Sequence, residues 1–198
     1  MRGYFGIGVE RVSKAMNVGS LFRTAHAFGA SFVFSIAAAY DRSEGGLADT
    51  SDAASNLPLY EFDDARALAL PRDCSLVAVE ITPDAAELPS FRHPRCAAYV
   101  FGAERGGLSP DLLELADHVV KIPTRFSVNL AVAGAIVMYD RLLSSNRFAR
   151  RPLVPGGAPE ELQPHEFGEP IWTKNERRRA AAREKKSKEA AEDPPTST

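Results

Sequence analysis

Three short segments of the sequence combine polar or charged side chains with glycine in ways that could support chemistry. The first runs from Asn17 to Ala25 and reads Asn-Val-Gly-Ser-Leu-Phe-Arg-Thr-Ala. Asn17 is a good helix N-cap, and Arg23 lies roughly 200° around the helix from the apolar stripe that includes Leu21. Arg23 therefore shares a small, open face with Ser20, where a cation could meet a ligand. The alternative interpretation is a capped surface helix that carries a solvated arginine.

The second segment is a glycine-rich turn that directly follows an apolar stretch. Phe101 to Ser109 reads Phe-Gly-Ala-Glu-Arg-Gly-Gly-Leu-Ser, and its one carboxylate belongs to Glu104. Glycines let backbone amides and carbonyls approach a ligand closely. The alternative interpretation is an ordinary strand-to-helix loop in which Ser109 caps the helix that follows.

The third segment, Ile122 to Leu130, joins a predicted strand to the last apolar helix. The strand is predicted to end at Ile122, and the helix is predicted to begin near Asn129. Ser127 and Asn129 place polar side chains at the mouth of an apolar core, where such groups need partners. A bound ligand could supply those partners. The alternative interpretation is a capped, buried helix.

Several common catalytic patterns are absent from the sequence. The segment from Gly6 to Arg11 matches a dinucleotide-binding fingerprint only in part, because Arg11 stands where the third glycine is required. There is no GxxxxGK[ST] phosphate loop, no GxSxG elbow and no HExxH pattern. Cys74 and Cys96 form no CxxC pair, which excludes a four-cysteine zinc site and a disulfide scaffold. We expect two ordinary buried thiols and no metal.

Other residues that could do chemistry are interpreted as structural. His26 lies beside the apolar stripe of its helix, and His93 and His118 are expected in a loop and at a strand edge, so packing is favoured over catalysis for all three. Phe167 and Trp172 are expected to dock on the globular body. Stacking on nucleic-acid bases is the alternative for these two aromatic residues.

Alternating strands and helices must position the three segments. Runs of apolar, β-branched and aromatic residues predict strands, while 3.6-residue periodicity with caps predicts helices. Strands separated by helices predict an α/β fold with a mostly parallel sheet flanked by helices. The predicted strands are 4–9, 31–38, 59–62, 76–81, 97–101 and 119–122, and the predicted helices are 18–28, 63–70, 110–116 and 129–145. The last helix is predicted to be buried because it is apolar on every side through Tyr139.

Composition divides the chain of 198 residues into three parts. Hydrophobic residues make up 44% and charged residues 25%, as in ordinary globular proteins, and the net charge of −2 excludes nucleic-acid binding by bulk charge. Residues 1–150 form the predicted domain. Residues 151–173 are rich in proline and glycine and predict a surface arm or linker. Residues 174–198 hold eight Lys or Arg and five Asp or Glu, and they predict a basic, flexible tail.

The sequence carries no recognisable signal for secretion or for a membrane. Residues 1–13 lack the apolar core and the cleavage pattern of a signal peptide. The most apolar stretch, residues 130–139, is about half of the roughly 20 residues that a membrane span needs. We therefore expect a soluble, cytoplasmic protein with reduced thiols.

Taken in order, the three segments resemble a known family. Asn-x-Gly-x-x-x-Arg, then Phe-Gly-x-Glu-x-x-Gly-Leu, then Ile-Pro followed by Ser-x-Asn at the head of an apolar helix resemble the SpoU (TrmH-like) branch of the SPOUT superfamily of RNA ribose 2′-O-methyltransferases. The resemblance runs from about Gly3 to Arg147. It implies a C-terminal trefoil knot, S-adenosyl-L-methionine as cofactor, and methyl transfer to a ribose 2′-hydroxyl of tRNA or rRNA. The loop Thr124–Phe126 is shorter than the cofactor-wrapping loop usual in the family.

The same resemblance implies roles for individual residues. Arg23 stands where the family has a residue near the attacking 2′-hydroxyl, and the residues that support it are Asn17, Glu104, Ser127 and Asn129. The implied cofactor contacts fall on Val79, Gly102, Ile122, Ser127 and Val128. The hydroxyl must lose a proton, and arginine is charged at almost any pH. Either a carboxylate or an RNA phosphate relays the proton, or Arg23 stabilises the developing alkoxide, and the sequence leaves both open.

The resemblance also implies two partners, RNA and a second copy of the chain. A homodimer is expected because the helix 129–143 is more apolar than one small domain can cover, and because relatives complete each active site from the partner, so that Arg23 could face the partner's cofactor. The rival function is a non-catalytic RNA-binding or assembly protein that retains the fold. A second rival, base methylation on the same scaffold, fits the Asn/Arg motif less well. The basic tail is expected to add RNA affinity.

Overall fold

The structure is a computed structural model that describes residues 3–39, 57–145, 148–159, 176 and 180–181. Its contacts group the chain into two units, Met1–Phe148 and Ala149–Thr198. The first unit holds every strand described below and all three segments singled out in the sequence. Each unit is described by itself.

One parallel sheet forms the centre of the first unit. The strands are ordered β3-β2-β1-β6-β4-β7-β5, and all neighbouring strands run in the same direction. They are β1 (Tyr4–Glu10), β2 (Phe32–Ile36), β3 (Leu59–Phe62), β4 (Ser75–Val79), β5 (Ala86–Glu87), β6 (Cys96–Phe101) and β7 (His118–Lys121). The predicted α/β class with a mostly parallel sheet is confirmed, whereas the trefoil knot stays a prediction.

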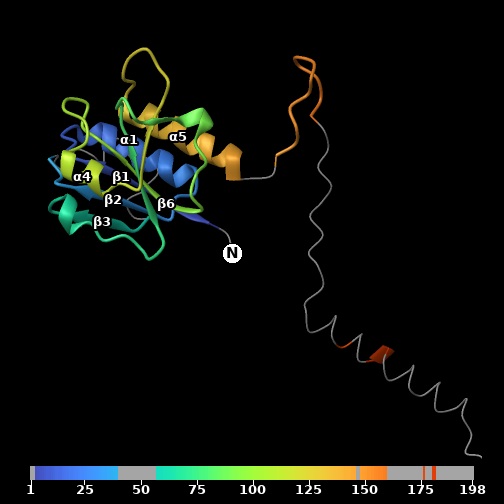
Figure 1. The fold of residues 1–198 in the computed structure, drawn as a ribbon, viewed down its shortest axis with the longest axis horizontal. Coiled ribbons are helices and arrows are strands. Elements are labelled where there is room, and N and C mark those ends of the chain that lie inside the picture. Colours follow the sequence, from blue (N-terminus) through green and yellow to red (C-terminus); the bar gives the residue numbers. More distant parts are fainter. Residues whose placement is uncertain (1–2, 40–56, 146–147, 160–175, 177–179, 182–198) are drawn as a thin grey trace, which may run out of the picture. The chain divides into compact units, whose positions relative to one another are not determined.

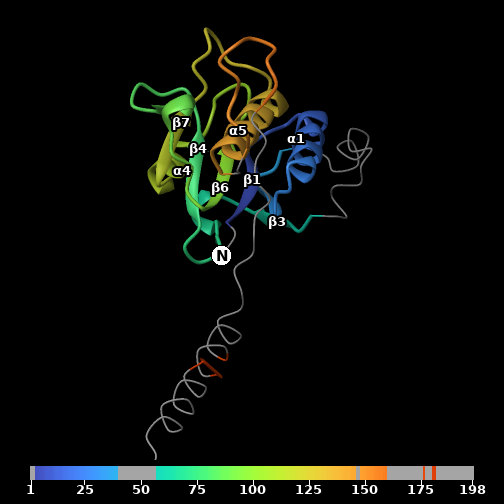
Figure 2. The ribbon, with the colours of Figure 1, turned by 90° about the vertical axis from the view of Figure 1, so that its right-hand side faces the viewer.

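Helices cover both faces of this sheet. α1 (Ala15–Ala27) and α5 (Leu130–Ser145) lie side by side on one face (Figure 1). α4 (Pro110–Leu115) packs with the short 3-10 helix η1 (Ala65–Ala67) on the other face. Figure 2 shows α4 and α1 on opposite sides of the strands. A second 3-10 helix, η2 (Leu88–Ser90), follows β5. None of the described helices is long and apolar enough to cross a bilayer.

The central strands are buried on both faces, because side chains alternate along a strand. In β6, Tyr99 packs into the core beneath α1 and α5, while Val100 packs into the core beneath α4. β1 departs from this pattern at two glycines. A Cβ atom at Gly8 would lie 2.2 Å from the ring of Phe34 in β2, so the glycine leaves the space that the ring fills. Parallel pairing places these two residues opposite each other.

Two predicted helices differ from the structure, one at its start and one at both ends. α1 begins at Ala15, and its N-cap is Lys14 without a side-chain bond, so Asn17 lies inside the first turn and is not the cap. The predicted helix 63–70 shortens to η1, in which the Asp64 carboxylate accepts from the Ala67 backbone N–H. α4 follows its prediction, because Ser109 caps it through the Leu112 backbone N–H.

The expectation that α5 is buried on all sides was also wrong. Val137 and Met138 are buried beneath the helix, but Val132 is 49% and Tyr139 52% exposed. Apolar character alone did not distinguish the face that packs on the sheet from the face that points outward. α5 packs closely on α1, where a Cβ atom at Gly134 would lie 2.1 Å from the Leu21 side chain.

The second unit is described in part. Residues 152–157 include a turn in which the Gly157 backbone N–H donates to the Val154 carbonyl at 3.0 Å. The arm predicted for residues 151–173 and the basic tail predicted for 174–198 stay predictions. Phe167, Trp172 and nearly all of the tail lie outside the described residues.

Candidate functional site

The glycine-rich loop and the Ile-Pro segment meet at the edge of the sheet where the strands end. A cleft of about 160 Å³ opens there between the loops that follow β4, β6 and β7, and we call it the carboxyl-edge cleft. In open parallel sheets, ligands bind outside the carboxyl ends of the strands. All five residues predicted to contact a cofactor line this one cleft, namely Val79, Gly102, Ile122, Ser127 and Val128.

The glycine-rich loop is a tight, self-contacting turn. The Gly107 backbone N–H donates to the Ala103 carbonyl at 3.1 Å, and the two residues form an isolated antiparallel bridge. A Cβ atom at Gly102 would lie 2.3 Å from the carbonyl carbon of Gly107. Gly107 has φ +63° and faces the Glu80 carboxylate, with 2.4 Å from a hypothetical Cβ to Oε2. The glycines therefore serve the fold of the loop, and they leave its backbone exposed to the cleft.

Two carboxylates that the sequence analysis missed fasten this loop to the sheet. Glu80, just after β4, accepts the Leu108 backbone N–H at 2.8 Å and the Ile81 backbone N–H at 2.8 Å. Glu10, the last residue of β1, is 2% exposed and accepts both the backbone N–H and the hydroxyl of Ser109. A carboxylate at the end of an otherwise apolar strand was the signal available in the sequence.

Three of the predicted catalytic residues form one chain of hydrogen bonds. The Asn17 side chain on α1 donates to Glu104 in the glycine-rich loop, and Asn129 donates to the Asn17 amide oxygen at 3.3 Å. The Asn129 oxygen also accepts the Ala131 backbone N–H at 2.9 Å, which caps the start of α5. Lys14, which the sequence analysis did not single out, pairs with the Glu104 carboxylate. Elements far apart in the sequence thus meet at Glu104.

The structure does not bring Arg23 into this network within one chain. Arg23 is exposed on α1, six residues beyond Asn17, which places it about 240° around the helix and about 9 Å along it. Among the described residues it has no hydrogen-bond or ion-pair partner. Ser127 is exposed and lines the cleft, likewise without a hydrogen bond to another described residue. The part of the chain described here holds no group of three or more metal-ligating side chains.

The residues interpreted as structural are placed as follows. The His93 side chain is 1% exposed and hydrogen-bonded, as expected for a packed histidine. His26 is half-buried, and His118 is exposed and packs edge-on against Phe91. Both cysteines are half-buried and free, so the expectation of buried thiols was only partly correct. Burial raises the pKa of Cys74, which favours the neutral thiol.

Comparison with known proteins gives one consistent result. Residues 5–139 match the model of the SpoU rRNA Methylase family. The chain is 27% identical over 139 residues to the mouse tRNA (guanosine(18)-2'-O)-methyltransferase TARBP1, covering 65% of this chain and 9% of the mouse protein. It is 26% identical over 142 residues to the tRNA (guanosine(18)-2'-O)-methyltransferase of Thermus thermophilus, covering 67% of this chain and 71% of that protein.

A solved structure shares the fold. The SpoU methyltransferase AviRb from Streptomyces viridochromogenes, in complex with the cofactor AdoMet, superposes with a TM-score of 0.63 at 24% identity. The superposition covers 74% of this chain and 60% of AviRb. The chain therefore spans about three fifths of AviRb and about a tenth of the mouse relative.

Proposed function

The chain belongs to the SpoU rRNA Methylase family, and from this we propose that it transfers a methyl group from S-adenosyl-L-methionine to a ribose 2′-hydroxyl of tRNA or rRNA. One observation carries the proposal: the five candidate cofactor residues, from three separate segments, line a single cleft beside the Asn17–Glu104–Asn129 chain. The curated relatives named above methylate guanosine 18 of tRNA at this hydroxyl. An RNA substrate of this kind is consistent with a cytoplasmic protein.

The residues of the carboxyl-edge cleft fit such a cofactor. Val79, Ile122 and Leu130 give the cleft apolar walls, suited to a flat purine ring. Gly102 leaves the backbone groups of the loop accessible, because a side chain at this position would clash with the backbone of Gly107. Glu80 and Glu104 also line the cleft and place negative charge near a ligand that carries a sulfonium and an ammonium group. When bound, the cofactor supplies an activated methyl group.

The chain's own residues then have to align the ribose and assist loss of the proton from its 2′-hydroxyl. Glu104 is already engaged by Lys14 and Asn17, which hold its carboxylate in place beside the glycine-rich loop. We therefore assign Glu104 to positioning the loop, and Arg23 to stabilising the negative charge that develops on the 2′-oxygen. The 2′-hydroxyl passes its proton to an RNA phosphate or to water as that oxygen takes the methyl group. Arginine stays charged throughout, so it acts by electrostatics and hydrogen bonding.

Arg23 can take this role if a second copy of the chain completes the site. The outer surface of α1 and α5 exposes Met16, Val132 and Tyr139, at 66%, 49% and 52%. An apolar hollow between the two helices includes Thr24, the neighbour of Arg23. A homodimer formed through this face covers the apolar side chains and carries each Arg23 toward the partner. Light scattering should give about twice the chain mass of 21.5 kDa.

The decisive experiment combines cofactor binding with product analysis. Calorimetric titration with S-adenosylmethionine should give saturable binding, and incubation with unmodified tRNA should yield 2′-O-methylated nucleosides by mass spectrometry. Cofactor binding without methylation of tRNA or rRNA favours the rival, a non-catalytic RNA-binding protein. A methyl group found on a base would instead favour base methylation on the same scaffold.

Complementation between two impaired variants tests the shared site, with S-adenosylmethionine kept too low to saturate Gly102→Ala. Arg23→Ala keeps the cleft but lacks the guanidinium, whereas Gly102→Ala keeps the guanidinium but distorts the cleft. Mixed heterodimers contain one composite site with both parts intact, so activity should return when the two proteins are mixed. If Arg23 acted within its own chain, the mixture would stay as inactive as its components.

A further inference from the structure

A second, larger cleft lies at the opposite edge of the sheet, where the parallel strands begin. We call it the amino-edge cleft, and its volume is about 1160 Å³ against about 160 Å³ for the carboxyl-edge cleft. Its walls come from the starts of β1 and β7, the segment 92–95 before β6, and the end of α5. The proposed methyl transfer uses none of these residues.

The side chains that line the amino-edge cleft are basic or neutral. Arg92, Arg95 and Arg141 line it together with His93 and His118, and no described aspartate or glutamate is among the lining residues. Arg92, Arg95 and His118 are exposed to solvent. This basic character is local, because residues 1–173 carry −5 once the +3 of residues 174–198 is removed from the −2 of the whole chain.

Arg141 adds a buried charge beneath this surface. It is 6% exposed, and its guanidinium donates to the carbonyls of Pro94, Arg95 and Tyr4 at 2.6, 2.9 and 3.2 Å. It also donates to the Tyr99 hydroxyl at 3.1 Å. All four acceptors are neutral, and Arg141 makes no ion pair with any carboxylate in the described residues. Its positive field is therefore not cancelled at close range.

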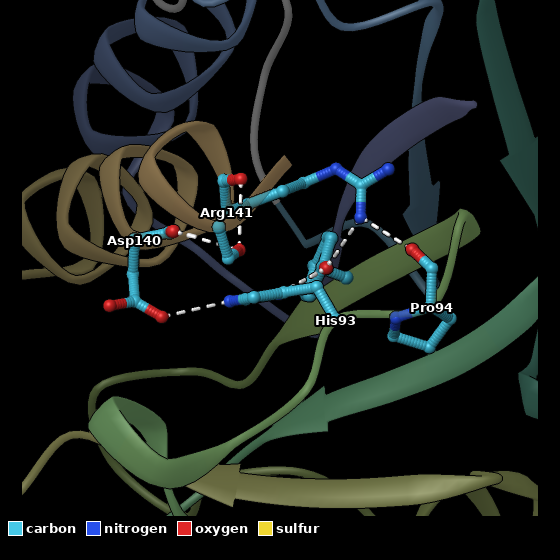
Figure 3. A network of polar contacts seen from close by, with 6 residues as sticks. His93, Pro94, Asp140 and Arg141 are labelled. Atoms are coloured by element: carbon cyan, nitrogen blue, oxygen red, sulfur yellow. Dashed lines mark hydrogen bonds and ion pairs between the residues drawn. The ribbon is translucent and has the colours of Figure 1, made fainter. Parts of the chain in front are cut away.

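The one acid of this network points away from the amino-edge cleft. His93 Nδ1 lies 2.6 Å from the Tyr99 hydroxyl, and His93 Nε2 lies 2.9 Å from Asp140 (Figure 3). Asp140 lines the hollow between α1 and α5 instead. Burial lowers the pKa of His93, although the hydrogen bond that His93 donates to the Asp140 carboxylate opposes this shift. Near neutral pH the uncharged ring therefore links the phenol to the carboxylate. The hydrogen bonds therefore lead from the Arg141 guanidinium at the amino-edge cleft, through Tyr99 and His93, to the Asp140 carboxylate.

We propose that the amino-edge cleft binds the phosphodiester backbone of the RNA substrate, at a contact remote from the methyl-transfer cleft. This inference rests on the proposed function, which identifies the RNA as the tRNA or rRNA that is methylated. Arginine forks suit phosphate oxygens, and phosphate contacts orient a nucleic acid without reading its sequence. The exposed side chains that can donate to phosphate stand on separate walls, with Arg92 and Arg95 before β6 and the His118 imidazole at the start of β7. This spread suits an extended polyanion better than a single phosphate ion.

The network beneath the cleft explains how this surface is held in place. Arg141 ties α5 to β1 and to the segment 92–95 through backbone carbonyls, so the two exposed arginines stand on an anchored backbone. A surface fixed before binding loses little conformational entropy when the RNA docks. The consequence is a second RNA contact that contributes affinity and orientation without touching the reacting ribose.

The test replaces Arg92 and Arg95 together. The double variant Arg92→Gln/Arg95→Gln is compared with Arg66→Gln/Arg72→Gln, which removes the same charge from two exposed arginines outside the cleft. Binding of a fluorescein-labelled, unmodified tRNA transcript is measured by anisotropy across a salt series, and S-adenosylmethionine affinity is measured by calorimetry. We expect the first variant to bind RNA about tenfold more weakly at physiological salt, with a salt slope smaller by about 1.4 to 1.8.

Each outcome decides the inference. Equal losses in the two double variants would show a bulk charge effect and overturn it, as would an unchanged affinity in both. Displacement of tRNA from the wild type by millimolar inorganic phosphate alone would assign the cleft to a small anion and also overturn it. The cofactor titration separates the two proposals: wild-type protein that binds no S-adenosylmethionine contradicts the methyl-transfer proposal, whereas the arginine dependence of RNA binding tests only this one.

Discussion

The two edges of the same parallel sheet are held together in opposite ways. At the carboxyl edge, glycine backbone turns are fastened by carboxylates, and the Lys14–Glu104 ion pair is 65% and 32% exposed. At the amino edge, a buried guanidinium and a buried imidazole bond to backbone carbonyls, a phenol and one carboxylate. At the carboxyl edge Glu10 is buried, but Lys14 and Glu104 remain accessible to a ligand. At the amino edge the polar groups of Arg141 and His93 are engaged in holding the backbone.

The contrast shows which edge is built for chemistry and which for support. A buried network with every member bonded is rigid and intolerant of change, because each unpaired buried group costs about 1–3 kcal/mol. Substitution of a partly exposed group changes the unfolding free energy little, but it can remove a contact that the activity requires. Substitutions at the carboxyl edge should therefore alter activity more than stability, and buried substitutions at the amino edge should do the reverse.

The largest expected effect is on turnover, at Arg23. Arg23→Ala should reduce the methylation rate by about 10² to 10⁴, as for loss of a group that acts on the reacting oxygen. Its exposure predicts a change in unfolding free energy within roughly ±0.5 kcal/mol. Arg23→Lys separates charge from shape, because lysine keeps the charge and lacks the planar fork. Normal turnover in Arg23→Ala, measured with saturating tRNA, would show that the guanidinium takes no part.

The reverse behaviour is expected at Arg141. Arg141→Met removes the donor to three carbonyls and a phenol, and the unfolding free energy should fall by roughly 3 kcal/mol or more. Urea unfolding measures this loss, and Arg72→Met is the exposed control. Affinity for S-adenosylmethionine should stay unchanged at temperatures where the variant is folded. A stability equal to wild type would contradict the role given to the buried network.

An intermediate case is Gly102→Ala, which should disturb function and stability together. The new Cβ would lie 2.3 Å from a backbone carbon, so the glycine-rich loop must move. We expect cofactor affinity to fall about tenfold and the unfolding free energy to fall by about 1–3 kcal/mol. Ala103→Ser, one residue along, is the control. Unchanged calorimetric binding in Gly102→Ala would place the cofactor away from this loop.

Deletion of residues 174–198 should have a smaller effect, on RNA affinity alone, with both edges of the sheet left intact. Loss of eight basic residues should raise the apparent KM for tRNA by a few-fold and flatten its salt dependence, with kcat unchanged. Steady-state kinetics at two salt concentrations measure both quantities. A salt dependence equal to that of the full chain would mean that the tail does not contact RNA.

The smallest effect concerns pH. Burial lowers the pKa of His93 in the folded state below its ordinary value near 6.5, so the unfolded chain binds the extra proton more readily. The stabilisation is complete above about pH 6.5 and is lost progressively as the pH falls from there to the lower pKa of the folded state, with a slope of at most about 1.4 kcal/mol per pH unit. Urea unfolding at several pH values should show a shallower slope for His93→Gln than for the exposed control His118→Gln.

More of the carboxyl edge than of the amino edge could be predicted from the sequence, for a physical reason. The cap at Ser109 and the polar start of α5 are local patterns in the sequence, and the meeting of Gly102 with Ile122 was implied by the resemblance to the family. Arg141 gives no such signal, because its partners come from β1 and from the segment before β6, and only the fold brings them to it. The pairing of Lys14 with Glu104 was missed for the same reason, since 90 residues separate them.

Errors in the predicted elements have equally specific causes. Asn17 was predicted to be the N-cap, but its amide donates to Glu104, and α1 begins three residues earlier than predicted, at Ala15. The strand β5 is two residues long and too short for any periodicity to indicate it. Helix 129–145 was assigned to the interior because its apolar residues have no clear polar face, although Val132 and Tyr139 point outward.

The contact between Gly8 and Phe34 has a consequence for how this family can diverge. A side chain at position 8 and a full aromatic ring at position 34 cannot occupy the same space, because a Cβ at Gly8 would lie 2.2 Å from that ring. A lineage that gains even alanine at the first position must reduce the residue at the second, or pass through a destabilised ancestor. We therefore expect the two positions to vary as a pair among descendants, with the order of the two replacements constrained so that the ring shrinks first.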